Sequence, residues 1–326
     1  MNTKPIIKLN FVDFLISHPI EDDWYYKTLS RYYNIVQSGS PDYIISGGLG
    51  HEHLNPKYDH CIKIVTIGEN YAPDFNLFDY AIGFDHLTFG DRYLRKPLYA
   101  FYPEFEKLRK RYIPDDESLL NRDFCSFVVS DAGADPLRIA FFRELSKYRP
   151  VASGGGVLNN VGGRVADKSA FCAKYKFNIA IENSSCPGYV TEKIMQAFAV
   201  NTVPIYFGDP LVSFDFNLES MVHIRNRGDV ERAIEDVIYL DTHDEAYLAK
   251  CRANPLVKSV EEHEQETIAF FRNIFDQPLE NARRQTLYGS QRSYRKRQRR
   301  LYLIDDLWRK PALKIYNIRR KFDRFK

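Results

Sequence analysis

Apolar residues gather in short runs that alternate with stretches of helical spacing. Runs rich in β-branched and aromatic residues predict strands. In the first half these strands fall at residues 6–12, 43–46, 61–68 and 80–84, and in the second half at residues 123–130, 151–153, 175–183 and 202–208. Apolar positions at helical spacing predict helices at residues 135–148, 191–200, 229–240, 244–252 and 258–275. This alternation is typical of α/β architecture with largely parallel sheets.

The length of the chain and a restart of this series predict two domains. A chain of 326 residues is about twice the usual domain of roughly 100–200 residues. The strand–helix series begins again at about Asn121, within a charged, proline-bearing loop. We therefore predict a first domain at residues 1–121, a second at residues 122–282, and a separate final segment at residues 283–326.

Composition narrows the class of protein. Aromatic residues make up 14% of the chain, which indicates a folded globular body. The five cysteines form no Cys-x-x-Cys pair, so we expect neither a zinc site nor a disulfide framework, and a reducing compartment fits best. We expect no secretory signal and no membrane-spanning segment, because the start lacks the signal pattern and no apolar run reaches about 18 residues.

The basic character of the chain is concentrated in its final segment. Residues 283–326 carry 16 Lys and Arg against three Asp and no Glu, although the whole chain has a net charge of only +3. Ile315, Ile318, Phe322 and Phe325 recur at helical spacing among these cations, which predicts a basic amphipathic helix on an anionic membrane surface. A solvated tail, or one that folds back on the acidic body, is the alternative. Nucleic acid is disfavoured, because an acidic body offers no extended basic surface.

The stretch ENSSCPGYVTEK, residues 182–193, follows a predicted strand and leads into a helix that begins near Thr191. Ligands of open α/β sheets bind beyond the carboxyl ends of the strands. Lys193 falls in the first turn of the helix, where a cation opposes the helix dipole by ~0.3–1 kcal/mol. A bound anion would reverse that sign. The alternative is that Thr191 caps the helix and Lys193 points into solvent.

A second cation follows a second predicted strand. Arg138 lies near the start of the helix that opens with Asp135-Pro136. Cations at two adjacent strand-to-helix turns of one sheet suggest a diphosphate site. The loop SGGGVLNNVGGRV, residues 153–165, has enough glycine to let backbone approach a ligand. It lacks the Gly-Lys-Ser/Thr of a Walker A loop, so ATP hydrolysis is not indicated.

Two long blocks of the sequence resemble the α-1,3-fucosyltransferases, especially the bacterial members. The first is YKFNIAIENSSCPGYVTEKIMQAFAVNTVPIYFGDP, and the second is TIGENYAPDFNLFDYAIGFDHLTFGDRYLRKPLY. With FVVSDAGADPLR and RPVASGGGVLNNVGGRV, the resemblance covers most of residues 60–275. Ile181 stands where the family signature usually has an aromatic residue.

The resemblance implies two Rossmann-like domains that face each other across a cleft, in the GT-B type of glycosyltransferase. The second domain would hold GDP-β-L-fucose and the first the acceptor. The implied reaction is transfer of L-fucose, with inversion, to an N-acetylglucosamine hydroxyl of an N-acetyllactosamine-type glycan. An α-1,4 transferase, a transferase of another nucleotide sugar and a non-catalytic glycan- or membrane-binding relative stay open.

The family also implies roles for individual residues. Glu69 would be the catalytic base, Arg138 and Lys193 would stabilise the leaving diphosphate, and Glu192 would hold the ribose hydroxyls. The chain contains no Asp-x-Asp, so we expect no metal cofactor. The remaining candidates are Asn183 and Tyr189 at the diphosphate or fucose, Glu182 and Ser184 as second choices, Asp85 and His86 on the acceptor side, and Tyr206 in the cleft or the core. We expect a cytoplasmic enzyme at the periphery of the bacterial inner membrane.

Overall fold

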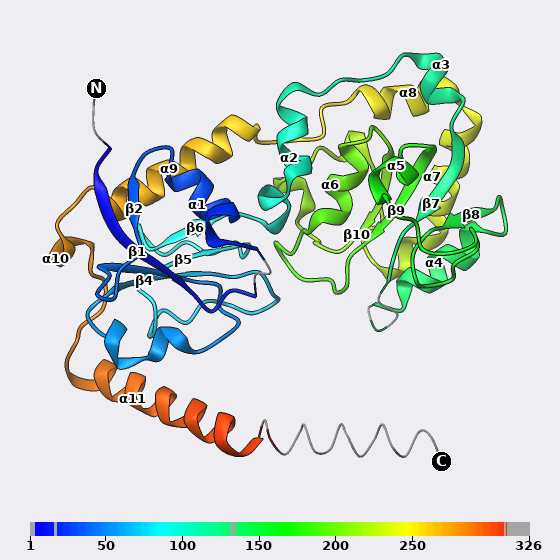
Figure 1. Cartoon of the computed structure of the whole chain (residues 1–326). Coiled ribbons are helices and arrows are strands. Elements are labelled where there is room, and N and C mark those ends of the chain that lie inside the picture. Colours follow the sequence, from blue (N-terminus) through cyan, green and yellow to red (C-terminus); the bar gives the residue numbers. More distant parts are fainter. Residues whose placement is uncertain (1–3, 16–17, 131–132, 134, 310, 312–326) are drawn as a thin grey trace. The chain divides into compact units, whose positions relative to one another are not determined.

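The chain folds into two compact α/β units (Figure 1). The computed structural model describes residues 4–15, 18–130, 133, 135–309 and 311. Unit 1 comprises residues 1–83, 88–94 and 268–326, and unit 2 comprises residues 84–87 and 95–267. The predicted α/β class with two Rossmann-like units is confirmed, because each unit is built on its own largely parallel sheet.

Unit 1 is built on a sheet of six strands in the order β2-β1-β3-β4-β5-β6. The strands are β1 (Ile6–Val12), β2 (Asn34–Val36), β3 (Tyr43–Ser46), β4 (Ile62–Thr66), β5 (Tyr80–Gly83) and β6 (Tyr93–Arg95). The pairings of β1 with β2 and β3, of β3 with β4, and of β4 with β5 are parallel. β3 and β5 are buried at every position, as expected for central strands covered on both faces.

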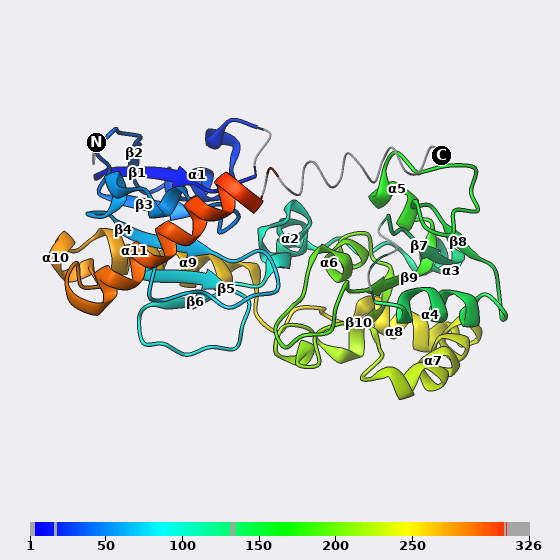
Figure 2. The ribbon, with the colours of Figure 1, turned by 90° about the horizontal axis from the view of Figure 1, so that it is seen from below.

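Helices cover this sheet on two sides. They are α1 (Trp24–Leu29), the end of α9 (Val260–Phe275), α10 (Leu279–Ala282) and α11 (Gly289–Ile304). α9 packs on the strands through aromatic contacts such as Phe275 on Tyr43 and Phe270 on Tyr80. Figure 2 shows α11 running along the other side of the sheet, where it contacts the short helix at Glu52–Leu54.

Unit 2 contains a five-stranded sheet in the order β11-β10-β9-β7-β8, with all pairings parallel. Its strands are β7 (Asp123–Phe127), β8 (Val151–Ser153), β9 (Tyr175–Ile181), β10 (Val203–Phe207) and β11 (Val222–His223). Its helices are α2 (Pro103–Lys107), α3 (Asp116–Leu120), α4 (Leu137–Leu145), α5 (Lys168–Cys172), α6 (Glu192–Phe198), α7 (Val230–Thr242) and α8 (Asp244–Arg252).

Alternate side chains of β9 build two cores on opposite faces of this sheet. Phe177, Ile179 and Ile181 join the core that packs under α4, α7 and α8. Ala180 joins the core that packs under α6. The six inner residues of β9 are therefore buried, which fits a parallel sheet covered on both faces. The same packing fixes the carboxyl end of β9 between two helical layers.

The division into units differs from the predicted domain boundaries in three places. Residues 84–87 group with unit 2 instead of the first domain. Residues 95–121 belong to unit 2, because α2 and the turn before it pack on α6. Residues 268–282 return to unit 1, because the second half of α9 packs its aromatic side chains on the first sheet. The chain thus leaves unit 2 within a helix, where no loop or composition change marks a boundary.

The described part of the final segment folds onto unit 1. Tyr294 donates a hydrogen bond to Asp74 at 2.9 Å, Arg299 pairs with Asp59 at 2.8 Å, and His51 pairs with Asp306 at 2.6 Å. For these residues the alternative of a tail that folds back on the body is confirmed. Ile315, Ile318, Phe322 and Phe325 lie outside the described residues. Among the helices that the structure describes, none is both long and apolar enough to cross a membrane.

Candidate functional site

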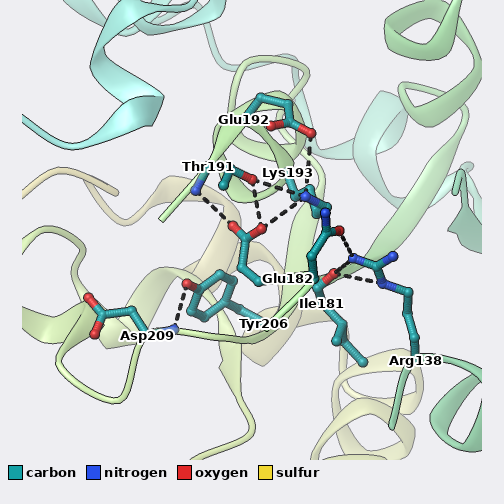
Figure 3. Close-up of polar contacts among 9 residues, drawn as sticks. Arg138, Ile181, Glu182, Thr191, Glu192, Lys193, Tyr206 and Asp209 are labelled. Atoms are coloured by element: carbon teal, nitrogen blue, oxygen red, sulfur yellow. Dashed lines mark hydrogen bonds and ion pairs between the residues drawn. The ribbon is translucent and has the colours of Figure 1, made fainter. Parts of the chain in front are cut away.

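Glu182 lies at the centre of a polar cluster beyond the carboxyl end of β9. Its carboxylate is 0% exposed and accepts hydrogen bonds from the Thr191 backbone N–H at 2.8 Å, the Thr191 hydroxyl at 2.7 Å and the Lys193 ammonium at 2.9 Å (Figure 3). Gly208 makes this burial possible, since a Cβ there would come within 2.4 Å of the Glu182 side chain. Burial raises the pKa of Glu182, although Lys193 and Thr191 oppose the shift.

The alternative in which Thr191 caps α6 and Lys193 points into solvent is wrong in both parts. Thr191 occupies the N-cap position, but its hydroxyl donates to Glu182 and accepts from the Lys193 ammonium at 3.1 Å, and it accepts from no backbone N–H of the helix. The Lys193 side chain is 16% exposed and pairs with Glu182, so it does not extend freely into solvent. A second choice at the sequence level, Glu182, is therefore the residue that organises this turn.

Glu192 and Lys193, in the first turn of α6, carry opposite charges. The Glu192 carboxylate lies 3.5 Å from the Lys193 ammonium. Burial alone would raise the pKa of Glu192, but Lys193 and Lys168 hold it below its usual value. Burial and the Glu192 carboxylate raise the pKa of Tyr102 to about 12. Glu192 is consequently an ionised acceptor that is 25% exposed and open to hydroxyl donors.

Arg138 is buried on α4 and holds the same strand end from the other side. Its guanidinium donates to the Ile181 carbonyl at 3.0 and 2.8 Å and to the Asn183 side-chain oxygen at 2.7 Å (Figure 3). Asn183 itself is exposed, and its carbonyl accepts from the Asp135 backbone N–H at 3.0 Å. The two predicted donor-side residues Arg138 and Asn183 are thus brought together at the end of β9.

The segment that carries Asp85 and His86 groups with unit 2 and packs on the same loop. Gly188 has φ +82°, and a Cβ there would come within 2.3 Å of the Phe84 carbonyl. Tyr189 is buried, and its ring packs edge-on against Phe84 at 5.4 Å between centroids. The loop between β9 and α6 therefore supports the backbone that precedes Asp85.

Charged groups of both signs, a guanidinium and carboxylates, surround His86 and Asp85. The His86 ring packs on Phe214, with 5.0 Å between centroids. Burial lowers the pKa of His86, and Arg95 adds to this effect. Burial raises the pKa of Asp85. Both shifts favour the neutral form of the side chain.

Tyr206 lies in the core of unit 2, which answers the open choice between cleft and core. Its side chain is 0% exposed, and its hydroxyl accepts a hydrogen bond from the Asp209 backbone N–H at 3.0 Å. Asp209 is also fully buried, and burial raises its pKa. Tyr206 thus shapes the turn after β10 and offers no exposed surface to an acceptor.

Glu69 lies in unit 1, three residues after the end of β4, and its side chain is exposed. Its backbone carbonyl accepts from the Tyr71 N–H at 2.8 Å, which forms a tight turn at the strand end.

In the glycine-rich loop of unit 2, at residues 153–165, one glycine serves packing and not the expected approach to a ligand. Gly155 packs against the backbone of Val129, where a Cβ would come within 2.0 Å, so this glycine serves the contact between two strand ends.

Comparison with known proteins places both halves of the chain in one family. Residues 9–102 match the model of the alpha-(1,3)-fucosyltransferase FucT N-terminal domain, and residues 121–273 match that of the glycosyltransferase family 10 (fucosyltransferase) C-terminal domain. A crystal structure of an alpha1,3-fucosyltransferase is 33% identical and superposes with a TM-score of 0.74 over 89% of this chain and 93% of that one. The chain belongs to glycosyltransferase family 10.

Two further fucosyltransferases show how similar the chain is to known proteins in sequence and in structure. The alpha-(1,3)-fucosyltransferase FucT of Helicobacter pylori is 37% identical over 267 residues, which are 71% of this chain and 56% of that protein. The chain thus spans about half the length of this curated relative. A crystal structure of an alpha1,3-fucosyltransferase with GDP-fucose is 32% identical, with a TM-score of 0.71 over 85% of this chain and 93% of that one.

The structure adds two residues that the sequence reading missed. Lys168 begins α5, directly after the glycine-rich loop, and acts electrostatically on Glu182, Glu192 and Lys193. Tyr102 precedes α2 and acts on Glu192. Lys168, like Lys193, is a lysine in the first turn of a helix, so the same sequence pattern could have predicted it. Tyr102 could not be predicted in this way, because it lies some 90 residues away along the chain.

Proposed function

We propose that this family 10 member is an inverting α-1,3-fucosyltransferase. It would move L-fucose from GDP-β-L-fucose to the N-acetylglucosamine hydroxyl of an N-acetyllactosamine-type glycan. Family membership and the solved relative with GDP-fucose support the donor. The single observation that carries the proposal is the cluster of Arg138, Asn183, Glu182, Glu192 and Lys193 at the carboxyl end of β9, where open α/β sheets bind ligands.

In this mechanism the donor side and the base have separate tasks. Arg138 and Lys193, with the N–H groups at the start of α6, stabilise the charge that develops on the departing GDP. Glu192 accepts hydrogen bonds from the ribose hydroxyls. Glu69 takes the proton from the acceptor hydroxyl as that oxygen attacks the sugar carbon from the face opposite the diphosphate, which inverts that carbon. Asp85 and His86 position the acceptor.

Incubation with GDP-fucose and N-acetyllactosamine, or its β1,3-linked isomer, tests the reaction. In N-acetyllactosamine galactose occupies the 4-OH of N-acetylglucosamine, and NMR should show fucose α-linked to the free 3-OH. In the β1,3-linked isomer galactose occupies the 3-OH, so this acceptor should not react. Transfer to the 4-OH of the isomer alone would replace the proposal with α-1,4 transfer. Titration calorimetry with GDP-fucose, GDP-mannose and UDP-sugars should show the tightest binding for GDP-fucose. If no sugar is transferred and no nucleotide sugar binds, the chain is a non-catalytic relative.

We also propose that the reaction needs no metal ion. The support is chemical, because the chain lacks Asp-x-Asp and places two cations at the strand ends that would meet the diphosphate. Initial rates should be unchanged by excess EDTA. Complete loss of activity in EDTA, restored by one divalent metal, would refute this part of the proposal.

The setting proposed is the cytoplasmic side of the bacterial inner membrane, with surface polysaccharide as the acceptor. The support is the spacing of apolar and basic residues at positions 312–326. Deletion of these residues should lower co-sedimentation with anionic vesicles and leave activity on a soluble acceptor intact. Unchanged co-sedimentation would remove the membrane assignment without touching the reaction.

A further inference from the structure

A second polar site lies in unit 1, where the first turns of α11 approach the loop at residues 59–60. A cavity of about 480 Å³ opens there, which is within the range of ligand sites. Four cationic side chains and one carboxylate line it, namely Arg292, Arg295, Lys296, Arg299 and Asp59. A cavity with this lining suits an anion rather than an apolar ligand.

The single carboxylate does not balance these cations. Asp59 pairs with Arg299 at 2.8 Å. Within the described part of the chain, Arg292, Arg295 and Lys296 make no ion pair. Arg295 is only 6% exposed, yet its guanidinium donates to the neutral oxygens of Gln285 at 3.2 Å and Thr286 at 2.9 Å. The carboxylates of Asp59 and Asp79 act on Arg295 through space but form no ion pair with it. A buried cation whose hydrogen bonds go only to neutral acceptors is costly unless an anion joins it.

Neighbouring groups increase the local positive charge. Lys63 is 2% exposed, and its ammonium donates to the His53 carbonyl at 2.6 Å. Burial lowers the pKa of Lys63 to about 8, and Arg295 contributes to the lowering. Arg283 hydrogen-bonds the His60 carbonyl beside the cavity. Asp59 and the buried Asp79 oppose the lowering of the Lys63 pKa. Cations still outnumber these two carboxylates from the cavity wall into the interior of unit 1.

We infer that this cavity binds a phosphate group, held by Arg292, Arg295 and Lys296. Arginine matches phosphate oxygens with two parallel N–H groups, and a lysine adds a mobile point charge. Arg295 is already fixed by Gln285 and Thr286, so it presents a preorganised donor, while the exposed Arg292 and Lys296 close on the ligand. The phosphate belongs either to a free small molecule or to a lipid headgroup.

Matched pairs of substitutions on α11 in the full chain test the site. R292Q/K296Q removes two exposed cations from the cavity, and R297Q/R300Q removes two other exposed cations that do not line it. Both variants lose the same charge, and circular dichroism melting checks that both stay folded. Titration calorimetry uses inorganic pyrophosphate. We expect R292Q/K296Q to weaken binding at least about tenfold and R297Q/R300Q to change it less than about twofold, since the loss of one charge-assisted hydrogen bond alone weakens binding about tenfold or more.

Co-sedimentation with phosphatidylcholine vesicles, with and without phosphatidylglycerol, separates the two sources. Selective loss of pyrophosphate binding alone assigns a free phosphate compound. Selective loss of anionic vesicle binding by R292Q/K296Q assigns a lipid headgroup. If both variants weaken both ligands equally, or if neither ligand binds saturably, the site is refuted, because only general attraction to a basic helix is then present. If pyrophosphate binds both variants as tightly as the wild type, it binds elsewhere, for example at the donor site of unit 2, and the cavity site is likewise refuted.

Discussion

The buried carboxylate of Glu182 binds Lys193 and shapes the turn that precedes α6. Removal of one partner from a buried ion pair leaves the other charge uncompensated. Glu182 is 0% exposed, and its three hydrogen bonds come from Thr191 and Lys193. Its substitution therefore affects the geometry of the donor side as well as stability.

We expect E182Q to lower the free energy of unfolding by about 3 kcal/mol. The amide keeps the size of the side chain but leaves the Lys193 ammonium without its buried counter-charge. E266Q is the control, because Glu266 pairs with Lys258 at 2.7 Å on the surface, and such pairs contribute about 1 kcal/mol or less. Urea unfolding measures both. Equal effects of the two substitutions would show that Glu182 is not a stabilising partner of Lys193.

Glu69 is the residue on which the proposed chemistry depends. A positioned general base contributes about 10²–10⁴-fold to rate. E69Q should lower kcat by at least about 100-fold and leave the affinity for GDP unchanged, because the donor-side residues lie in unit 2. E21Q, at another exposed glutamate of unit 1, is the control and should have normal turnover. Near-normal kcat in folded E69Q would remove Glu69 from the mechanism.

At the scale of elements, the loop between β9 and α6 depends on the close approach of Gly188 to Phe84. An alanine at a positive φ costs about 1–2 kcal/mol from its own backbone. At Gly188 its Cβ would also come within 2.3 Å of a backbone oxygen, which cannot move like a flexible side chain. The substitution should therefore displace the segment that carries Asp85 and His86.

G188A should destabilise unit 2 by more than G162A. Gly162 has φ +86°, close to the +82° of Gly188, but a Cβ at Gly162 meets nothing within 4 Å. The difference between the two variants thus measures the contact and not the backbone strain. Urea unfolding should show the excess loss in G188A, and its KM for the acceptor should rise while that of G162A stays normal. Equal stability of the variants would contradict the close contact.

Periodicity predicted the long elements well because burial controls them. β1, β3, β4, β5, β7, β9 and β10, together with α4, α6, α7, α8 and α9, lie within about two residues of the expected ranges at most of their ends. The short edge strands β2, β6 and β11 were missed, since two or three residues carry no readable period. β8 is equally short but was predicted, because it directly follows a predicted helix in the alternating series. Helical spacing in α9 could not reveal which sheet each half of that helix covers.

The candidate site was predictable only in part. Strand ends and helix starts singled out Arg138 and Lys193 from local sequence. Local sequence could not show that Glu182 is buried beneath Lys193, because this depends on the absence of a side chain at Gly208 in the next strand-to-loop turn. Burial of Tyr206 likewise follows from packing under α6.

At the scale of the whole molecule, acid should weaken the protein chiefly through a buried histidine of unit 2. His263 on α9 is 4% exposed and lies 3.3 Å from the Tyr99 hydroxyl. Burial lowers its pKa to about 3, and Lys96, Lys258 and Arg95 add to this. Below pH 6.5 the unfolded chain binds a proton there and the folded chain does not. The contribution of the neutral His263 side chain to the free energy of unfolding is complete above pH 6.5. It is lost as the pH falls toward 3, by about 1.4 kcal/mol for each pH unit.

The wild type should therefore lose about 2 kcal/mol more than H263Q when the pH falls from 7 to 5. Carboxylates titrate in both proteins, so their effects cancel in the difference. Lys96, whose pKa burial lowers to about 8, stays protonated throughout this range.

Both tryptophans, Trp24 and Trp308, belong to unit 1, so tryptophan fluorescence would not report on unit 2. Amide hydrogen exchange of β9, corrected for intrinsic rates, measures opening of the correct unit. H18Q, at an exposed histidine, should keep the wild-type slope, and an equal slope in H263Q would mean that another group senses the acid.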